Sequence, residues 1–180
     1  MHTIGNWFAV YGLMVAITSV GSANAADVMR TKTVGPYKVE LHVLPAEPFF
    51  SKEDVATKHL KEGMEVEGGA TPLMLDAASH PNHHLVVHVF DGKTRRVLTD
   101  ATVTMKFTPL GKELSAAVDV EVPVVVMQAI GKGPSSTHYG NNVSMPAGRY
   151  NVTVTINGRP TDFSVTASDA PSKGMGHMKM

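Results

Sequence analysis

The C-terminal part of the chain contains two short runs of alternating apolar and polar residues, joined by Asn157-Gly158. Residues 149–156 place Tyr, Val, Val and Ile at every second position, and residues 161–166 continue the alternation with Phe163 and Val165. Asn-Gly readily adopts the two positive φ angles of a type I′ turn, so this segment predicts an antiparallel β-hairpin. This hairpin is the strongest single constraint on the fold.

Further strand signals precede the hairpin at regular spacing. Four segments either alternate between apolar and polar residues or are rich in Val: residues 37–44, 85–90, 99–108 and 118–127. Pro123 within the last segment indicates an edge strand or a bulge, because proline cannot donate to a sheet ladder. Short strands at this spacing predict an all-β fold, an immunoglobulin-like antiparallel β-sandwich.

Two other segments are less regular. Residues 26–35 are expected to form a loose lead-in without regular structure. Ser51, with Asp54 three residues later, has the pattern of a helix cap and predicts a short helix that continues to Leu60.

The two ends of the chain are expected to lie outside the folded domain. Residues 4–20 are mostly apolar, and Ala23-Asn24-Ala25 follows as a small-x-small cleavage pattern, so residues 1–25 are interpreted as a signal peptide. An uncleaved membrane anchor is the alternative, although a transmembrane helix needs about 20 apolar residues. Residues 26–168 would form the exported, soluble, periplasmic domain, and residues 169–180 a flexible tail.

Composition and motifs argue against several classes of function. The 16 basic and 16 acidic residues balance, so neither a nucleic-acid footprint nor a polybasic membrane patch is visible. No cysteine is present, which excludes a thiol nucleophile and leaves nitrogen, oxygen and thioether sulfur as metal ligands. No serine-hydrolase elbow, H-E-x-x-H pattern, P-loop or dinucleotide fingerprint occurs. We therefore expect a binding protein and not an enzyme.

Histidine is concentrated in residues 80–88, where four of the nine histidines of the chain occur. His84 and His88 fall on the same face of the expected strand, but four residues of extended chain separate them by about 13 Å. Both can bind one ion directly only if a bulge intervenes. The alternative is that these are solvated loop histidines together with one packed strand histidine.

A second group of metal-ligand residues follows further along the chain. Met127 ends an expected strand, and His138 follows a glycine-rich loop. A thioether beside imidazoles favours copper, as Cu(I) or Cu(II), over iron or zinc. A methionine such as Met127, taken alone, is more often a core residue than a ligand, since methionine fills gaps in packed interiors. The tail carries Met175, His177, Met178 and Met180, which would form either a soft-metal scavenging segment or a segment without a role.

Residues 138–143 (HYGNNV) and 148–152 (GRYNV), together with His84–His88, resemble a known family, the periplasmic high-affinity iron-transport proteins. The resemblance covers residues 37–156. It implies an immunoglobulin-like, usually dimeric protein that binds copper while serving ferrous iron uptake. It makes His84, Met127 and His138 the candidate ligands, and it places His88 where the family has an acidic residue.

The chain departs from the family pattern in three ways. Ten residues separate Met127 from His138, a longer loop than the family has, and His88 in place of an acid shifts the preference from Fe(II) towards copper. The family's remaining histidine has no matching position, although His42 or His177 could substitute for it.

The expected function is a periplasmic copper- or ferrous-iron-binding protein that delivers its metal to a membrane transporter or acceptor protein, with a homodimer as a possible state. The alternatives are an exported protein-interaction module and a metal-dependent oxidase or reductase.

Overall fold

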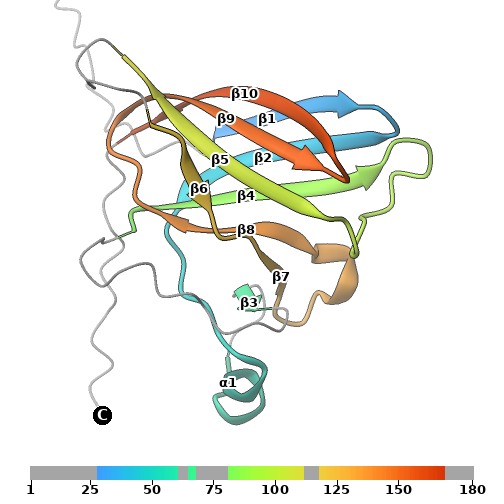
Figure 1. The fold of residues 1–180 in the computed structure, drawn as a ribbon. Helices are drawn as coiled ribbons and strands as arrows, with labels where there is room; N and C mark the ends of the chain where they lie inside the picture. The colour runs from blue at the N-terminus through green and yellow to red at the C-terminus, as the bar shows by residue number, and fades with distance from the viewer. Residues whose placement is uncertain (1–27, 61–64, 68–80, 112–117, 169–180) are drawn as a thin grey trace, which may run out of the picture.

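The computed structural model describes residues 28–60, 65–67, 81–111 and 118–168, and these residues form two packed β-sheets (Figure 1). The six-stranded sheet has, in spatial order, β1 (Val28–Val34), β2 (Tyr37–Pro45), β4 (His83–Asp91), β8 (His138–Val143), β7 (Val125–Ala129) and β3 (Glu65–Glu67). The four-stranded sheet has β10 (Arg159–Ala167), β9 (Gly148–Ile156), β5 (Val103–Leu110) and β6 (Val120–Val122). Neighbouring strands pair antiparallel in both sheets, which confirms the predicted all-β sandwich. The immunoglobulin-like topology remains a prediction.

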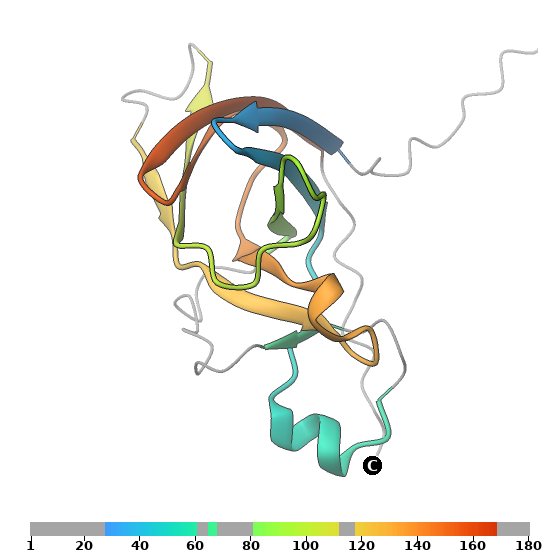
Figure 2. The same ribbon diagram turned by 90° about the vertical axis from the view of Figure 1, so that its right-hand side faces the viewer.

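The core lies between the two sheets, which face each other in Figure 2. Alternate residues of the central strands point inwards, so the six-stranded sheet contributes Leu41 and Leu85 while the four-stranded sheet contributes Phe107 and Phe163. Along one side the edge strands β1 and β10 meet. There Lys32 donates from Nζ to the Asp162 carbonyl at 2.5 Å, and its ammonium lies over the Phe163 ring.

The predicted hairpin is present as β9, a two-residue turn and β10. Asn157 and Gly158 have φ angles of 48° and 78°, the left-handed values that a type I′ turn requires. The strands expected at 37–44 and 85–90 are also present, as β2 and β4.

The predicted loose lead-in at residues 26–35 is wrong, because Val28–Val34 forms β1 and pairs along its length with β2. This edge strand carries exposed residues on both faces, among them Met29, Arg30 and Lys32, so it lacks the apolar alternation that marks a half-buried strand. Residues 28–34 are held in a strand by their backbone pairing with β2.

The single strand predicted over residues 118–127 is also wrong. The chain forms β6, passes Pro123-Val124, and forms β7 in the other sheet. Proline has no N–H to donate to a ladder, so the strand pairing stops there. The Pro123 carbonyl instead accepts a hydrogen bond from Asn141 Nδ2 at 2.7 Å. Pro123 thus marks where the chain crosses between the two layers.

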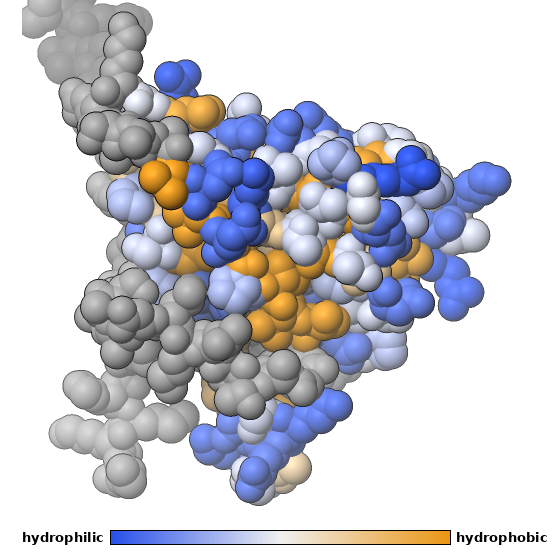
Figure 3. All heavy atoms as spheres, viewed as in Figure 1, coloured by the Kyte–Doolittle hydropathy of each residue, from blue (hydrophilic) through white to orange (hydrophobic). Residues whose placement is uncertain are grey.

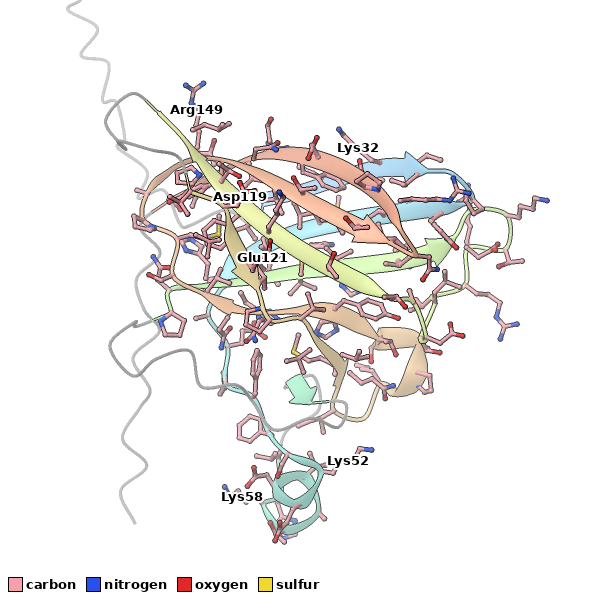
Figure 4. All side chains as sticks on the ribbon, viewed as in Figure 1. Lys32, Lys52, Lys58, Asp119, Glu121 and Arg149 are labelled. Carbon is pink, nitrogen blue, oxygen red and sulfur yellow. The ribbon has the colours of Figure 1, made fainter. Side chains whose placement is uncertain are left out.

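The short helix α1 (Lys52–Thr57) has the predicted capping box, in which Ser51 Oγ accepts from the Asp54 amide and Asp54 accepts from the Ser51 amide. It ends at Thr57, before the predicted end at Leu60. Figure 4 shows Lys52 and Lys58 pointing outwards here, away from both sheets. Within the described ranges, no helix is long and apolar enough to cross a membrane. The predicted signal peptide and C-terminal tail lie outside the described residues.

Candidate metal centre

The outer face of the six-stranded sheet, opposite the core, carries most of the histidines that the sequence singles out. Leu85, Val87 and Val89 of β4 belong to the core, so His84 and His88, on alternate positions, point to the outer face. The same alternation places His42 of β2 and His138 of β8 on this face. Antiparallel register therefore gathers histidines from three strands.

These four imidazoles form a continuous series of ring contacts, which we call the histidine row (His42, His88, His138 and His84). The ring centroids of His42 and His88 are 5.3 Å apart, and those of His88 and His138 are also 5.3 Å apart. The His138 and His84 centroids are 6.1 Å apart with nearly perpendicular rings. His138 thus stands between the two histidines of β4, which the strand geometry alone keeps apart.

The His84 ring is held from one side by Asn142 of β8. His84 Nδ1 lies 3.1 Å from Asn142 Oδ1, and the same oxygen accepts the Glu47 amide at 3.2 Å. Asn142 Nδ2 donates to the Glu47 carbonyl at 2.7 Å, which fixes the amide orientation. Because Oδ1 is the acceptor, Nδ1 of a neutral His84 must carry the proton, and Nε2 then carries the lone pair.

His138 is oriented in the same way. Its Nδ1 lies 2.9 Å from the carbonyl oxygen of Ser136, so it donates and Nε2 again carries the lone pair. The Nε2 atoms of His84 and His138 are both shielded from solvent. An Nδ1–H bonded to an oxygen is the arrangement that orients metal-ligating histidines in proteins.

Ser136 belongs to the compact connection between β7 and β8, which contains the 3₁₀ helix η1 (Gly133–Ser136). Ser136 Oγ accepts the Ala129 amide at 3.1 Å and donates to the Gly133 carbonyl at 2.7 Å. Gln128 Nε2 donates to Thr137 Oγ1 at 3.1 Å. These bonds set the position of the Ser136 carbonyl, and through it that of the His138 ring.

Met127 is fully buried and stands directly opposite His138 in the β7–β8 ladder. Residues paired in this way place their Cβ atoms about 5 Å apart on one face of the sheet. The thioether therefore lies on the face of the histidine row, on the side of His138 away from β4. Met127 does not belong to the core cluster between the sheets.

Gly140 lies on β8 between His138 and Asn142, at a point where β8 approaches β4 closely. It pairs with Val86 in the β4–β8 ladder, between the His84–Asn142 pair and the position of His138. A Cβ built on Gly140 would lie 2.1 Å from the Leu85 carbonyl oxygen, far inside contact distance. Glycine is thus required here by the close approach of β4 and β8.

The ring spacings fall in the range that a shared ion requires. Two imidazoles that bind one ion through nitrogens about 2.0 Å away place their centroids about 5 Å apart in a tetrahedral site and about 6 Å apart in a linear one. Across the described parts of the chain, no three His, Cys, Asp or Glu side chains are grouped to hold a metal ion. The rings of His84 and His138 lie close to each other, and Met127 is paired with His138 in the adjacent ladder.

One charged pair lies at the outer end of the histidine row. Glu40 stands opposite His88 in the β2–β4 ladder and is ion-paired with Lys38 at 2.6 Å. Phe90 stacks on His88, with ring centroids 6.2 Å apart. In contrast, Asp119 and Glu121, labelled in Figure 4, belong to the β6 region of the other sheet. There the Lys106 ammonium holds the pKa of Asp119 below its ordinary value.

The structure brings His84, His138 and His88 together, with Met127 opposite His138. His138, which was expected to follow a glycine-rich loop, is the first residue of β8. Sequence reasoning missed the contributions of Asn142 and Ser136. It named His42 only as a substitute for a missing family histidine. Aligning the polar positions of segments 37–44 and 85–90 as antiparallel neighbours would have placed His42 near His88.

Comparison with known proteins finds no family model that matches the chain, and no curated protein or solved structure that matches it significantly.

Proposed function

We propose that this protein is an exported copper-binding protein that holds Cu(I) on the outer face of its six-stranded sheet. The ligands are Nε2 of His84, Nε2 of His138 and the sulfur of Met127. One observation carries the proposal: the two rings lie 6.1 Å apart while each Nδ1 is anchored on an oxygen. Anchored in this way, each imidazole is oriented and tautomerically fixed as a metal ligand.

The donor set favours Cu(I) over the other candidate metals. Thioether sulfur is a soft ligand that selects Cu(I), whereas a hard ion such as Fe(II) favours carboxylate oxygen. The proposed set contains no carboxylate, and His88 occupies the position where the iron-transport family has an acid. Fe(II) is the second metal to test, because the resemblance to that family points to iron uptake.

The burial of the donors supports a carrier and not a catalyst. His84 and Met127 are fully buried and His138 is 3% exposed, so a bound ion would be screened from solvent and from adventitious oxidants. Together with the leader-like residues 1–25, this favours a periplasmic role in which the ion passes to a membrane transporter or an acceptor protein. The resemblance to the iron-transport family supports the same role.

The test is a competition titration of the purified protein with a chromophoric Cu(I) chelator, repeated with Cu(II) and Fe(II). His138→Ala and Met127→Ala should each weaken Cu(I) binding by about tenfold or more, because each removes a donor. His59→Ala is the matched control, since His59 is exposed and lies outside the histidine row. Unchanged Cu(I) affinity in both site variants would overturn the proposal.

A second candidate, a protein-interaction module or homodimer, rests on an apolar surface over β6 and β7 (Figure 3). Val120 is 43% exposed and Val126 is 37% exposed there. A Val120→Thr/Val126→Thr variant should leave Cu(I) binding unchanged. If the surface is an interface between copies, the same variant should shift the sedimentation coefficient of the protein towards that of a monomer.

A further inference from the structure

Solvent exposure changes along the histidine row. His84 and His138 are buried, whereas His88 and His42 are only partly buried. The ring contacts run without a break from the partly exposed outer pair (His42 and His88) to the buried inner pair (His138 and His84). The row therefore runs from two partly exposed residues, of which His42 has its Nε2 shielded from solvent, to the proposed Cu(I) ligands.

The inner end of the row is covered. Phe49 packs edge-on against His84, with ring centroids 5.3 Å apart. The backbone of Glu47 is tied to Asn142 by two hydrogen bonds, at 3.2 Å and 2.7 Å. An ion that approached His84 from this side would have to displace the segment that carries Glu47 and Phe49. The outer pair offers a path that breaks none of these contacts.

We infer that His42 and His88 form a second, surface-proximal Cu(I) site through which the ion reaches His138, His84 and Met127. This inference rests on the proposed function, since it describes how the buried site is filled. Two imidazoles that share an ion at a roughly tetrahedral angle lie about 5 Å apart, and the spacing of the outer pair, 5.3 Å, is close to this value. His88 contacts both His42 and His138, so it receives the ion from one ring and passes it to the other.

The transfer is a sequence of ligand exchanges. In the first exchange, the Cu–N bond to His42 breaks as a Cu–N bond to His138 forms, while His88 stays bound to the ion. In the second, the Cu–N bond to His88 breaks as bonds to His84 and Met127 form. Copper remains Cu(I) throughout, no electron is transferred, and each imidazole keeps its single N–H. Glu40, opposite His88, adds a carboxylate beside the outer pair, and Lys38 balances its charge.

The discriminating variant is His42→Phe. Phenylalanine keeps an aromatic ring against His88 and preserves packing, but it has no nitrogen to bind copper. The purified full chain is mixed in a stopped-flow instrument with the Cu(I) complex of a chromophoric chelator, and the transfer rate and final occupancy are both recorded. His42→Ala serves as a second variant, and His59→Phe, at an exposed position outside the row, is the control.

Loading of His42→Phe and His42→Ala should be about tenfold slower than that of the wild type, with the final Cu(I) affinity unchanged. Loading at the wild-type rate would overturn the outer site and leave the proposed function standing. If the His42 variants lose as much Cu(I) affinity as His138→Ala does, the outer site is also overturned, because His42 would then be a ligand of the buried site. If the wild type binds no Cu(I), the proposed function fails and the outer site fails with it.

Discussion

Met127 and His138 stand directly opposite each other in the β7–β8 ladder, and both are buried. The turn that joins their strands is fastened by side-chain hydrogen bonds from Gln128 to Thr137 and between Ser136 and the Ala129 amide. The residues that carry the thioether and the imidazole are thus held opposite each other by the β7–β8 pairing and its connection, independently of β4. His84 then adds the second imidazole across the β4–β8 pairing.

Replacing Met127 with leucine should separate its packing role from its ligand role. Leucine has nearly the same volume, so the free energy of unfolding should fall by less than about 1.5 kcal/mol. The Cu(I) affinity should nevertheless fall about tenfold or more, because the thioether is lost. Chemical denaturation and chelator competition measure the two effects.

Met105→Leu is the matched control for that variant, since Met105 is equally buried but lies in the core between the sheets. It should change stability by a similar amount and leave Cu(I) affinity as in the wild type. Equal affinity losses in the two variants would mean that Met127 acts only through packing.

Removing the Asn142 side chain should loosen the His84 ring. Asn142→Ala deletes the acceptor of His84 Nδ1 and both bonds to Glu47. Loss of such an orienting partner typically costs 10- to 100-fold in metal affinity, and we expect an effect of about this size on Cu(I) binding. Asn151→Ala on β9 of the other sheet is the comparison variant, and its affinity should match that of the wild type.

Substituting Gly140 should disrupt the pairing of β4 with β8. A Cβ at this position would lie 2.1 Å from the Leu85 carbonyl oxygen, and backbone must move to relieve such a clash. We expect Gly140→Ala to lower the free energy of unfolding by about 3 kcal/mol or more. A Cβ at Gly111 meets nothing within 4 Å, so Gly111→Ala should be close to neutral in the same denaturation experiment.

The protein should lose stability at alkaline pH through its buried phenols. Burial raises the pKa of Tyr150 above its ordinary value of 10.0, and its hydroxyl donates to the Pro146 carbonyl at 2.6 Å. Because the folded-state pKa is the higher one, this stability is fully present below about pH 10 and is lost as the pH rises through the folded-state pKa. Urea denaturation at about pH 8 and about pH 11 should show a smaller alkaline loss in Tyr150→Phe than in the wild type.

Burial also raises the pKa of Tyr139, so part of the alkaline loss should persist in Tyr150→Phe. Tyr37→Phe, at a partly buried position near the sheet end, is the control. If Tyr150→Phe and the wild type lose the same stability between about pH 8 and about pH 11, ionisation of Tyr150 does not contribute to the alkaline loss.

The elements that the sequence predicts well are those whose burial is one-sided. The strands at 37–44 and 149–156 alternate because one face meets the core and the other meets solvent or a polar layer. Strand β8 escaped prediction because both of its faces are mostly buried, so His138 to Val143 shows no alternation. Its polar residues are bonded within the fold, as Asn142 is to Glu47.

The candidate site was only partly predictable for a related reason. His84, Met127 and His138 carry ligand chemistry that residue type alone reveals. Their meeting depends on strand order, which places β8 between β4 and β7, and local patterns do not specify strand order. The part played by His42 follows from the register of β2 with β4, which is likewise a property of the assembled sheet.

Tyr139 and His138 are consecutive residues that face opposite sides of the sheet. The Tyr139 hydroxyl donates to the Leu98 carbonyl at 2.8 Å and accepts the Ala101 amide at 3.0 Å, which locks its ring in the core. Neighbouring side chains on a strand point in opposite directions. The two hydrogen bonds that hold Tyr139 in the core therefore also direct His138 to the outer face. A substitution of an outward residue such as His138 can therefore change the ligand chemistry of the outer face while the core contacts of Tyr139 keep the strand in place.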